Sequence, residues 1–153
     1  MASGDPVQGF NYRQTSRTLK TMTGCTKGYV LCYDTDGFAH ATQALRTAAT
    51  TYSIVVAFET VVAPGSGQSV AKVIEDGVIE IEKVTGAIDK GQLVGLSTTA
   101  GKVGAYVAPD APSTYAEATV QAELDKLLYV VGVCHEAAAS GDASVKVKRG
   151  GVQ

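Results

Sequence analysis

The sequence contains two hairpin patterns, and each of them occurs twice in the same order. Lys27–Ala39 reads KGYVLCYDTDGFA and Lys90–Val103 reads KGQLVGLSTTAGKV, so in both a Lys-Gly step opens an apolar run that a small polar turn closes. The second pattern spans Val55–Gly77 and returns in Val130–Gly151. Apolar runs closed by polar turns predict β-hairpins. The chain is therefore predicted to build the same β unit twice.

The size of the chain favours one domain that holds both copies. With 153 residues and 45% hydrophobic content, it can bury a core. We expect a single β-rich domain over residues 21–153, with repeats at about 21–77 and 83–151, preceded by an extended N-terminal arm over residues 1–20. Only 18% of the residues are charged, against roughly 25% in typical soluble domains. A weakly charged surface loses little hydration when it meets a partner, which suits a subunit of an assembly.

Charge and hydropathy argue against two classes of partner. The net charge of −2 and the pI near 5.6 provide no basic face, so nucleic acid is not an expected partner. No apolar stretch approaches the ~18 residues of a membrane span, and the N-terminus lacks the pattern of a secretory signal, so we expect no membrane partner and a cytosol-like compartment. Cys25, Cys32 and Cys134 lack paired spacing, which predicts free and mostly buried thiols.

The N-terminal arm differs in pattern from the rest of the chain. It has neither helical nor strand periodicity, and its polar residues surround isolated Phe10, Tyr12 and Leu19. Ordering each residue costs ~1–2 kcal/mol of backbone entropy, so we expect the arm to become ordered against a neighbouring subunit. Deletion of Met1–Lys20 is then expected to leave a folded domain. The alternative is a first strand that docks along the edge of the sheet.

Several segments outside the arm predict strands. Tyr29–Tyr33 is rich in β-forming residues, and Asp34–Gly37 supplies a turn for the return strand. Tyr52–Val62 is too apolar to alternate, which is typical of a buried strand, and Pro64 prevents its continuation. The next strand is predicted to start near Ser69.

Two further segments predict strands with one wet face. Val145–Lys148 and Ile79–Glu82 alternate apolar with charged side chains, so the apolar set of each should face the core. Ala71 interrupts the match between the two copies and is interpreted as an inserted residue, which predicts a β-bulge.

The two copies differ in the middle by an insertion. Lys27 and Lys90 are 63 positions apart, whereas Glu59 and Glu136 are 77 apart, so the second copy carries 14 extra residues. In the first copy the corresponding segment, His40–Thr51, is predicted to be a loop or a short helix.

The insertion, at about residues 109–128, predicts a helix. Val120, Leu124 and Leu127 recur at helical spacing, and Thr114 with Glu117 matches a capping box. The apolar stripe of this helix is expected to pack on the sheet. The predicted fold is therefore mainly β, a duplicated β-hairpin unit in a compact sandwich-like or barrel-like domain with one short covering helix and the extended N-terminal arm.

Two segments resemble ligand-binding or catalytic motifs, but each lacks a residue that the motif requires. Asp34–Gly37 resembles the start of a calcium loop, but Ala39 and Leu45 stand where that loop needs Gly and Glu. Gly65–Ser69 lacks the Lys of a phosphate-binding loop, and Pro64 replaces the first Gly of a nucleophile elbow. These segments are interpreted as turns.

The remaining titratable residues do not predict an active site. Cys134 and His135 are adjacent on a predicted strand, so their side chains leave opposite faces. Two histidines without clustered ligands do not predict a zinc site. Glu59 and Glu136 occupy equivalent repeat positions, where solvation of a strand end is a simpler role than acid and base catalysis. We expect no enzyme activity, no cofactor and no metal.

A family resemblance rests on the second copy. Thr85–Val103 followed by Tyr129–Arg149 resembles the small phage head-decoration, or capsid cement, proteins. The matching residues are Lys90, Gly91, Leu93, Gly101, Lys102 and Val103, then Gly132, Val133, Glu136, Ala137, Ala138, Gly141, Val145 and Val147. The resemblance extends over about residues 23–149, and the N-terminal arm and the insertion depart from the family pattern.

The resemblance implies a non-enzymatic protein of the virion. Such a protein would be made in the host cytoplasm, bind the major capsid protein on the outer surface of an icosahedral head, and associate with itself, commonly as a homotrimer. The family often uses its N-terminal segment for this contact, and here Phe10, Tyr12, Arg13 and Arg17 are the candidate capsid-binding residues, because aromatic and Arg side chains dominate interface energetics. The alternative is a virion fibre or tail accessory module that binds a host receptor or glycan.

Overall fold

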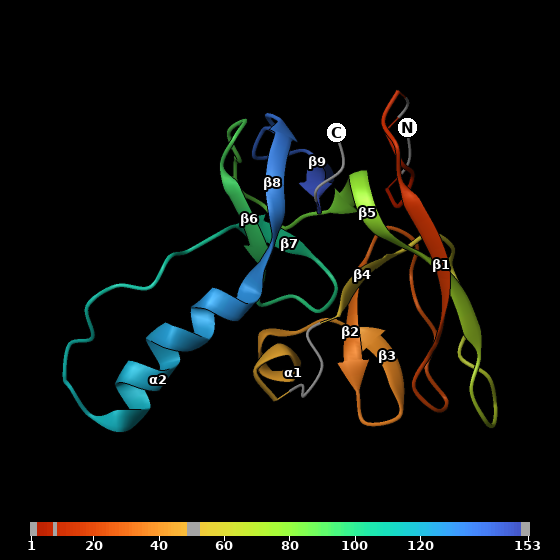
Figure 1. The fold of residues 1–153 in the computed structure, drawn as a ribbon, viewed down its shortest axis with the longest axis horizontal. Coiled ribbons are helices and arrows are strands. Elements are labelled where there is room, and N and C mark those ends of the chain that lie inside the picture. Colours follow the sequence, from red (N-terminus) through yellow and green to blue (C-terminus); the bar gives the residue numbers. More distant parts are fainter. Residues whose placement is uncertain (1–2, 8, 49–52, 151–153) are drawn as a thin grey trace.

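The computed structural model describes residues 3–7, 9–48 and 53–150, and it is mainly β (Figure 1). In chain order its elements are β1 (Arg13–Thr18), β2 (Val30–Asp34), β3 (Gly37–His40), α1 (Gln43–Ala48), β4 (Ile54–Ala57), β5 (Val70–Glu82), β6 (Leu93–Leu96), β7 (Val103–Ala105), α2 (Glu117–Asp125), the 3-10 helix η1 (Lys126–Tyr129), β8 (Val130–Glu136) and β9 (Ser144–Arg149). The start of the predicted arm, the junction between the predicted loop and strand at Thr51 and Tyr52, and the end of the second repeat at Gly151 lie outside the described residues.

The order of the strands confirms the duplication. The sheet runs β3-β2-β4-β5-β9-β8-β6-β7, and all of its pairs are antiparallel. From one end, the first repeat gives β3 and β2, the two strands of its first hairpin, and then β4 and β5, the two strands of its second hairpin. From the other end, the second repeat gives β7 and β6 and then β8 and β9, in the same order of parts. The four predicted hairpins are all present, and the two copies meet where β5 pairs with β9 (Figure 1).

Isolated bridges outside the strands repeat the same symmetry. Two occur in each repeat, Leu19–Phe38 with Cys25–Val61 in the first and Lys83–Val103 with Ile88–Ala138 in the second. The first bridge of each pair is parallel and joins the end of the leading strand to the last strand of the first hairpin. Each half of the sheet therefore curls toward closure, with β1 leading the first repeat and the second half of β5 leading the second.

The N-terminal arm lies on its own domain, contrary to the expectation that it orders against a neighbour. Strand β1 pairs with β5 from Thr18 opposite Val70 to Arg13 opposite Asp76, and Leu19 is wholly buried. The docked first strand, which was the alternative, is the observed arrangement. β1 and its counterpart in the second repeat, the second half of β5, share no repeated residues. The repeat therefore did not indicate this strand in the sequence.

The residues before β1 also hydrogen-bond to β5. Pro6 bridges Ile79, the Val7 amide donates to the Val78 carbonyl at 2.8 Å, and Asp5 forms an ion pair with Lys27 at 2.6 Å. Residues 4–7 and 13–18 therefore hold the chain at two places on one strand, and residues 9–12 form a loop between them.

We expect deletion of Met1–Lys20 to abolish cooperative folding, because it removes a paired strand together with the buried Leu19. A shorter deletion of residues 1–12 keeps β1 and should give a stability between those of the deleted and intact chains. Thermal unfolding followed by circular dichroism would test this order. A full deletion that melts as cooperatively as the intact chain would contradict it.

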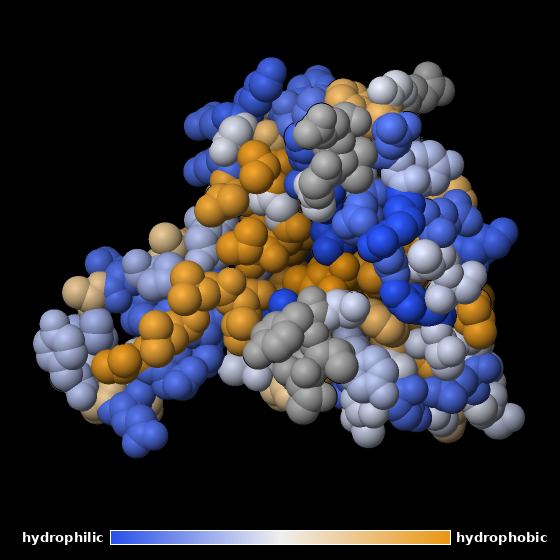
Figure 2. All heavy atoms as spheres, in the orientation of Figure 1, coloured by the Kyte–Doolittle hydropathy of each residue, from blue (hydrophilic) through white to orange (hydrophobic). Residues whose placement is uncertain are grey.

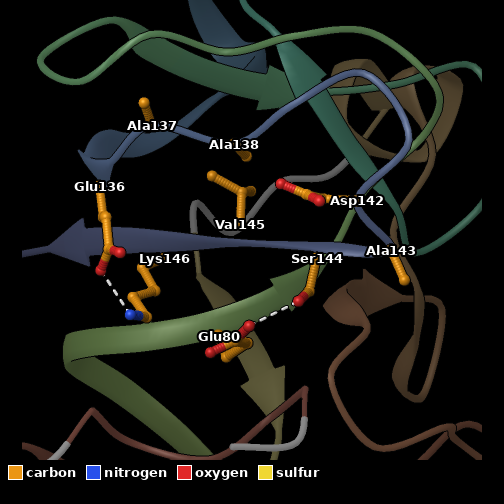
Figure 3. A pocket seen from close by; sticks show the side chains of 9 residues that line it. All are labelled: Glu80, Glu136, Ala137, Ala138, Asp142, Ala143, Ser144, Val145 and Lys146. Carbon is orange, nitrogen blue, oxygen red and sulfur yellow. Dashed lines mark hydrogen bonds and ion pairs between the residues drawn. The ribbon is translucent and has the colours of Figure 1, made fainter.

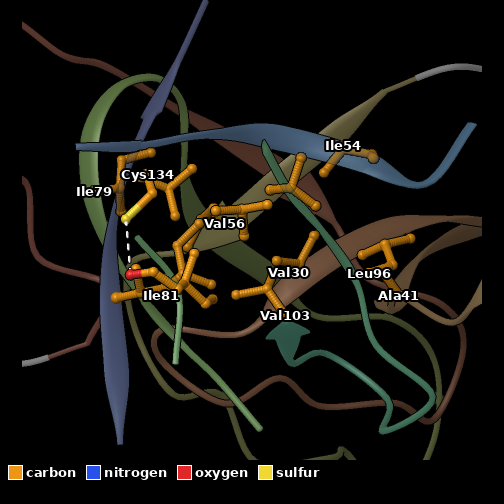
Figure 4. Close-up of a cluster of buried hydrophobic side chains, with 14 of the residues drawn as sticks. Val30, Ala41, Ile54, Val56, Ile79, Ile81, Leu96, Val103 and Cys134 are labelled. Atoms are coloured by element: carbon orange, nitrogen blue, oxygen red, sulfur yellow. Dashed lines mark hydrogen bonds between the residues drawn. The ribbon is translucent and has the colours of Figure 1, made fainter. Parts of the chain in front are cut away.

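The hydrophobic core explains why the first-repeat strands are apolar on both faces. Leu31, Val55 and Val73 line the interior of the first repeat, while their neighbours Val30, Val56 and Ile74 join a larger cluster with the inner residues of the second repeat (Figure 4). A strand that is buried on both faces does not alternate. The predicted alternation holds in the second repeat, where Val145, Val147, Ile79 and Ile81 are buried.

A partly buried arginine joins the two repeats. Arg149 in β9 donates from Nη2 to the Ile54 carbonyl at 2.7 Å and from Nε to the Val131 carbonyl at 3.1 Å. Burial lowers the pKa of Arg149 to about 10, so the guanidinium stays protonated at neutral pH. One charged side chain thus connects β4 of the first repeat to β8 of the second.

The insertion forms a helix, but the helix does not cover the sheet. The predicted helix is present as α2 followed by η1, and α1 is the short helix at the equivalent place in the first repeat. None of the nine residues of α2, all of which the structure describes, is buried, and the helix extends away from the strands (Figure 1). The predicted capping box is also wrong, because Ala116 is the N-cap and makes no side-chain cap hydrogen bond.

The bulge predicted at Ala71 is absent from that position. Ala71 pairs in regular register with Arg17 and is wholly buried, as its second-repeat counterpart Val145 is. The register shift in this pair of strands occurs between Gln14 and Arg13 instead, opposite Glu75. The small side chain of Ala71 at a core position had concealed the match with Val145.

The Lys-Gly steps that open both repeats have the same conformation. Gly28 and Gly91 have φ of +82° and +84°, a region that favours glycine. The Gly28 amide donates to the Ala57 carbonyl, and the Gly91 amide donates to the Cys134 carbonyl, both at 2.8 Å. The repeated glycine is thus required by a repeated turn.

The two glycines form a matched pair for mutation. Replacement of Gly91 by Ala meets no heavy atom within 4 Å, so it should cost about 1–2 kcal/mol of unfolding free energy through φ alone. A Cβ on Gly28 would lie 2.3 Å from the Ser3 Cβ, so Gly28→Ala should cost more and displace the N-terminal segment. Urea unfolding of both variants tests this order, and equal losses would argue against docking of that segment at Gly28.

Candidate interaction surface

The cysteines and histidines are not arranged for catalysis. Cys25, Cys32 and Cys134 are free and buried, and burial raises the pKa of each thiol. Cys134 points into the core while His135 packs outside against Phe10, so the predicted separation of these two side chains is confirmed. His40 accepts a hydrogen bond from the Thr26 amide at 3.1 Å, and burial lowers its pKa.

An open polar pocket of about 330 Å³ lies at the β8–β9 turn (Figure 3). Its carboxylates bind protein groups: Glu136 pairs with Lys146, Glu80 accepts from the Ser144 hydroxyl at 2.6 Å, and Asp142 accepts from the Ala139 amide at 2.7 Å. These contacts fix the turn between β8 and β9 and engage each of the three carboxylates with a group of the protein itself.

The other motifs are placed as turns and strand ends. Asp36 donates from its amide to the Asp34 carbonyl at 2.7 Å, which closes the predicted turn between β2 and β3. A hydrogen bond from Lys20 lowers the pKa of Asp34, so this turn also holds the end of the leading strand. Glu59 accepts from the Lys72 amide at 2.8 Å, and each repeat-equivalent glutamate thus binds within its own repeat.

Within the described ranges, no three His, Cys, Asp or Glu side chains gather as a set that could hold a metal ion. The helices in the same part of the chain are all too short or too polar to span a membrane.

Two of the four predicted interface residues lie together in the loop between the docked segments. We call residues 9–12 the aromatic loop. Phe10 and Tyr12 in this loop are 37% and 47% exposed, and the Phe10 ring meets His135 edge-on at 4.8 Å between centroids. With Phe58 and Asp5 they line a shallow groove of about 440 Å³.

The other two predicted residues hold β1 on the sheet. Arg13 pairs with Glu75 at 2.8 Å and with Asp76 at 2.9 Å, and Arg17 also pairs with Glu75. Thr15 donates to the same Glu75 carboxylate at 3.0 Å. The structure therefore separates the two arginines, which make intramolecular ion pairs, from the two exposed aromatic residues.

Sequence reasoning missed one residue of this groove and the exposure of one helix. Phe58 lies far from the aromatic loop in sequence and follows a buried strand, so no pattern connected them. The exposure of Leu124 and Leu127 was also missed, since an amphipathic helix normally packs on its own domain.

Comparison of the chain with protein-family models, with curated proteins and with solved structures finds no match.

The Glu75 cluster predicts an acid-sensitive attachment of β1. Burial would raise the pKa of Glu75, but the Thr15 hydrogen bond and the charges of Arg17 and Arg13 outweigh it and lower that pKa below its ordinary value. The stabilisation that the Glu75 carboxylate gives to the folded state is therefore complete above the ordinary pKa of a glutamate. It is lost as the pH falls through the lower pKa that Glu75 has in the folded protein. We expect Glu75→Gln to lower the unfolding free energy by about 1–2 kcal/mol at neutral pH.

The difference between Glu75→Gln and the wild type should shrink in acid. Denaturant unfolding at a series of pH values measures it. Glu123→Gln is the matched control, because Glu123 also has a lowered pKa, through its hydrogen bond with Lys126, but lies on the projecting α2. A stability difference for Glu75→Gln that is independent of pH would contradict the role of the carboxylate charge.

Proposed function

We propose that this protein is a capsid decoration protein. It would bind the outer surface of an icosahedral head through the aromatic loop, bridge neighbouring major capsid protein subunits, and act as a homotrimer without catalysis. The family resemblance of the second repeat suggested this function, and the observation that supports it best is the pre-ordered, exposed aromatic loop.

The aromatic loop is suited to binding because its backbone is already held in place. Residues 4–7 pair with the second half of β5 and residues 13–18 with the first half, so both ends of the loop are anchored. A rigid loop loses little conformational entropy on binding. Its exposed rings can therefore contribute apolar contact area at low entropic cost, as interface aromatic residues do.

Bridging adds contacts at the seams where shell subunits separate under load. A standard protein interface buries ~1,200–2,000 Å². A trimer would make three equivalent contacts with one shell, so modest individual affinities combine into strong attachment. The groove beside Phe10 extends the contact area that a capsid loop could fill.

The alternative, a fibre or tail module that binds a host glycan, is favoured by one observation. Three aromatic residues and Asp5 line the same groove, and exposed rings beside a carboxylate can stack on and hydrogen-bond to a sugar. A glycan array with the purified protein separates this function from shell binding.

A pair of substitutions tests the proposed function. We expect Phe10→Ala with Tyr12→Ala to weaken binding to undecorated heads of the encoding phage at least about tenfold. The measurement is co-sedimentation of protein with heads over a concentration series. Unchanged thermal unfolding would show that the loop variant is folded, since both side chains are partly exposed.

Tyr115→Ala is the matched control for the loss of an aromatic ring. Tyr115 is 85% exposed and lies outside the aromatic loop, so this variant should bind heads like the wild type. A wild-type protein that does not sediment with heads would overturn the proposed function. Full binding by the double variant would overturn the role of the loop.

A further inference from the structure

The insertion between β7 and β8 contains a helix, α2, of which no residue is buried. We call residues 106–129 the helical projection. Val107, Leu124 and Leu127 in it are 68%, 50% and 59% exposed, and α2 contributes no residue to the core. The equivalent connection in the first repeat holds α1, where Leu45 packs against the core. The second repeat therefore directs the same connection outward.

Polar contacts hold the helical projection at its base and within itself, and at the base Arg46 donates from Nε to the Leu128 carbonyl at 3.0 Å. The Asp110 amide donates to Glu123 Oε2 at 2.9 Å, which ties the outgoing segment to the returning helix, and Lys126 pairs with the same carboxylate at 2.6 Å. Its helix has nine residues, whereas isolated helices shorter than ~12–15 residues are marginal in water. Contact with another surface would supply the packing that most protein helices depend on.

The exposed side of α2 presents an apolar stripe with an acidic edge. Val120 and Leu124 in α2 and Leu127 in the adjoining η1 are spaced four and three residues apart, which places them on one side of the helix. Glu117, three residues before Val120, lies at the edge of this stripe and is exposed. In Figure 2 apolar side chains follow the length of the helix and continue onto the body of the protein.

The outer face of the second repeat carries a complementary patch. Leu93, Val133 and Lys148 lie directly opposite one another across β6, β8 and β9, so their side chains share one face. Leu93 and Val133 are 43% and 38% exposed, and Lys148 is exposed. Among the described residues, Lys148 makes no ion pair. We call these three residues the strand patch.

The charges of the chain are divided between the helical projection and the body. The projection holds four of the fifteen acidic residues and one of the thirteen basic residues, so its formal charge is −3 while that of the whole chain is −2. The rest of the chain therefore carries +1. This division favours contact of the projection with the body of another copy over contact between two projections, which would repel each other.

We propose that the helical projection of one copy docks on the strand patch of a second copy. The apolar stripe of α2 would cover Leu93 and Val133, and Glu117 would approach Lys148. The projection and the patch are different surfaces of one chain, so this is a head-to-tail contact, which closes into a ring when the rotation permits. The proposal specifies the self-association included in the proposed function, and it can be tested without shells.

The molar mass of the full chain in solution tests this contact. At about 100 µM, above the micromolar dissociation constants of modest interfaces, light scattering after gel filtration should give a mass well above the 15.8 kDa of one chain. Leu124→Glu with Leu127→Glu should give the single-chain mass, and at a concentration low enough for both proteins to be single chains it should unfold thermally like the wild type, because both side chains are exposed. Tyr115→Glu, which lies outside the stripe, should remain associated.

A complementation experiment distinguishes the strand patch from other partners of the helix. Val133→Glu alone should also give single chains. Mixed with the double leucine variant it should form a dimer, because the Val133 variant retains an intact projection and the leucine variant an intact patch. Single-chain mass for the wild type would overturn the proposal, as would an associated Val133 variant or a mixture that stays monomeric. Shell binding is measured separately, so these failures are distinct from failure of the proposed function.

Discussion

Strand β5 hydrogen-bonds to both repeats, and it changes partners at Gly77. Its first half pairs with β1 and β4, and its second half with β9 and the N-terminal segment. Gly77 has φ of +131°, and a Cβ there would lie 2.8 Å from the Tyr12 Cβ. Glycine at this position therefore permits both the turn of the strand and the close approach of the chain that leads into β1. The position of the aromatic loop follows from this change of partners at Gly77. The segment before the loop pairs with β5 beyond Gly77, and the segment after the loop, β1, pairs with β5 ahead of Gly77.

The two repeats share a backbone plan but have different surroundings. The first repeat buries both faces of β2 and β4, one around its own interior and the other against the second repeat. The second repeat keeps an outer face where Leu93 and Val133 remain exposed, and it alone extends its β7–β8 connection outward. Duplication thus provides two units that can bury apolar surface against each other, and divergence leaves the second unit with the surfaces available to partners. Even a core position has diverged, since Lys83 replaces Leu19 and donates from Nζ to three backbone carbonyls.

The two proposed contacts use neighbouring surfaces of this plan. The aromatic loop lies over the junction of the repeats, where Phe10 meets His135, two residues from Val133 of the strand patch. The helical projection leaves the second repeat after β7 and returns to β8 through η1. Docking on the strand patch would therefore bring the helical projection of one copy beside the aromatic loop of the next. A ring of linked copies would present several aromatic loops to one shell, so shell binding would gain from the contact between copies. The buried thiols and the internally paired carboxylates belong to the folded structure itself.

The sequence by itself determined the duplication, the four hairpins, the helical insertion and the turn at Asp34–Gly37, because local patterns of apolar residues, glycines and turn residues specify short-range structure. Only the tertiary structure decided where the ends of these units pair. It placed β1 on β5 although its residues show no strand period, and it turned Arg13 and Arg17 toward Glu75. It also left α2 uncovered, although the apolar stripe of that helix is the pattern of a packed one. These outcomes depend on contacts between residues far apart in the chain, which the period of a single segment does not encode.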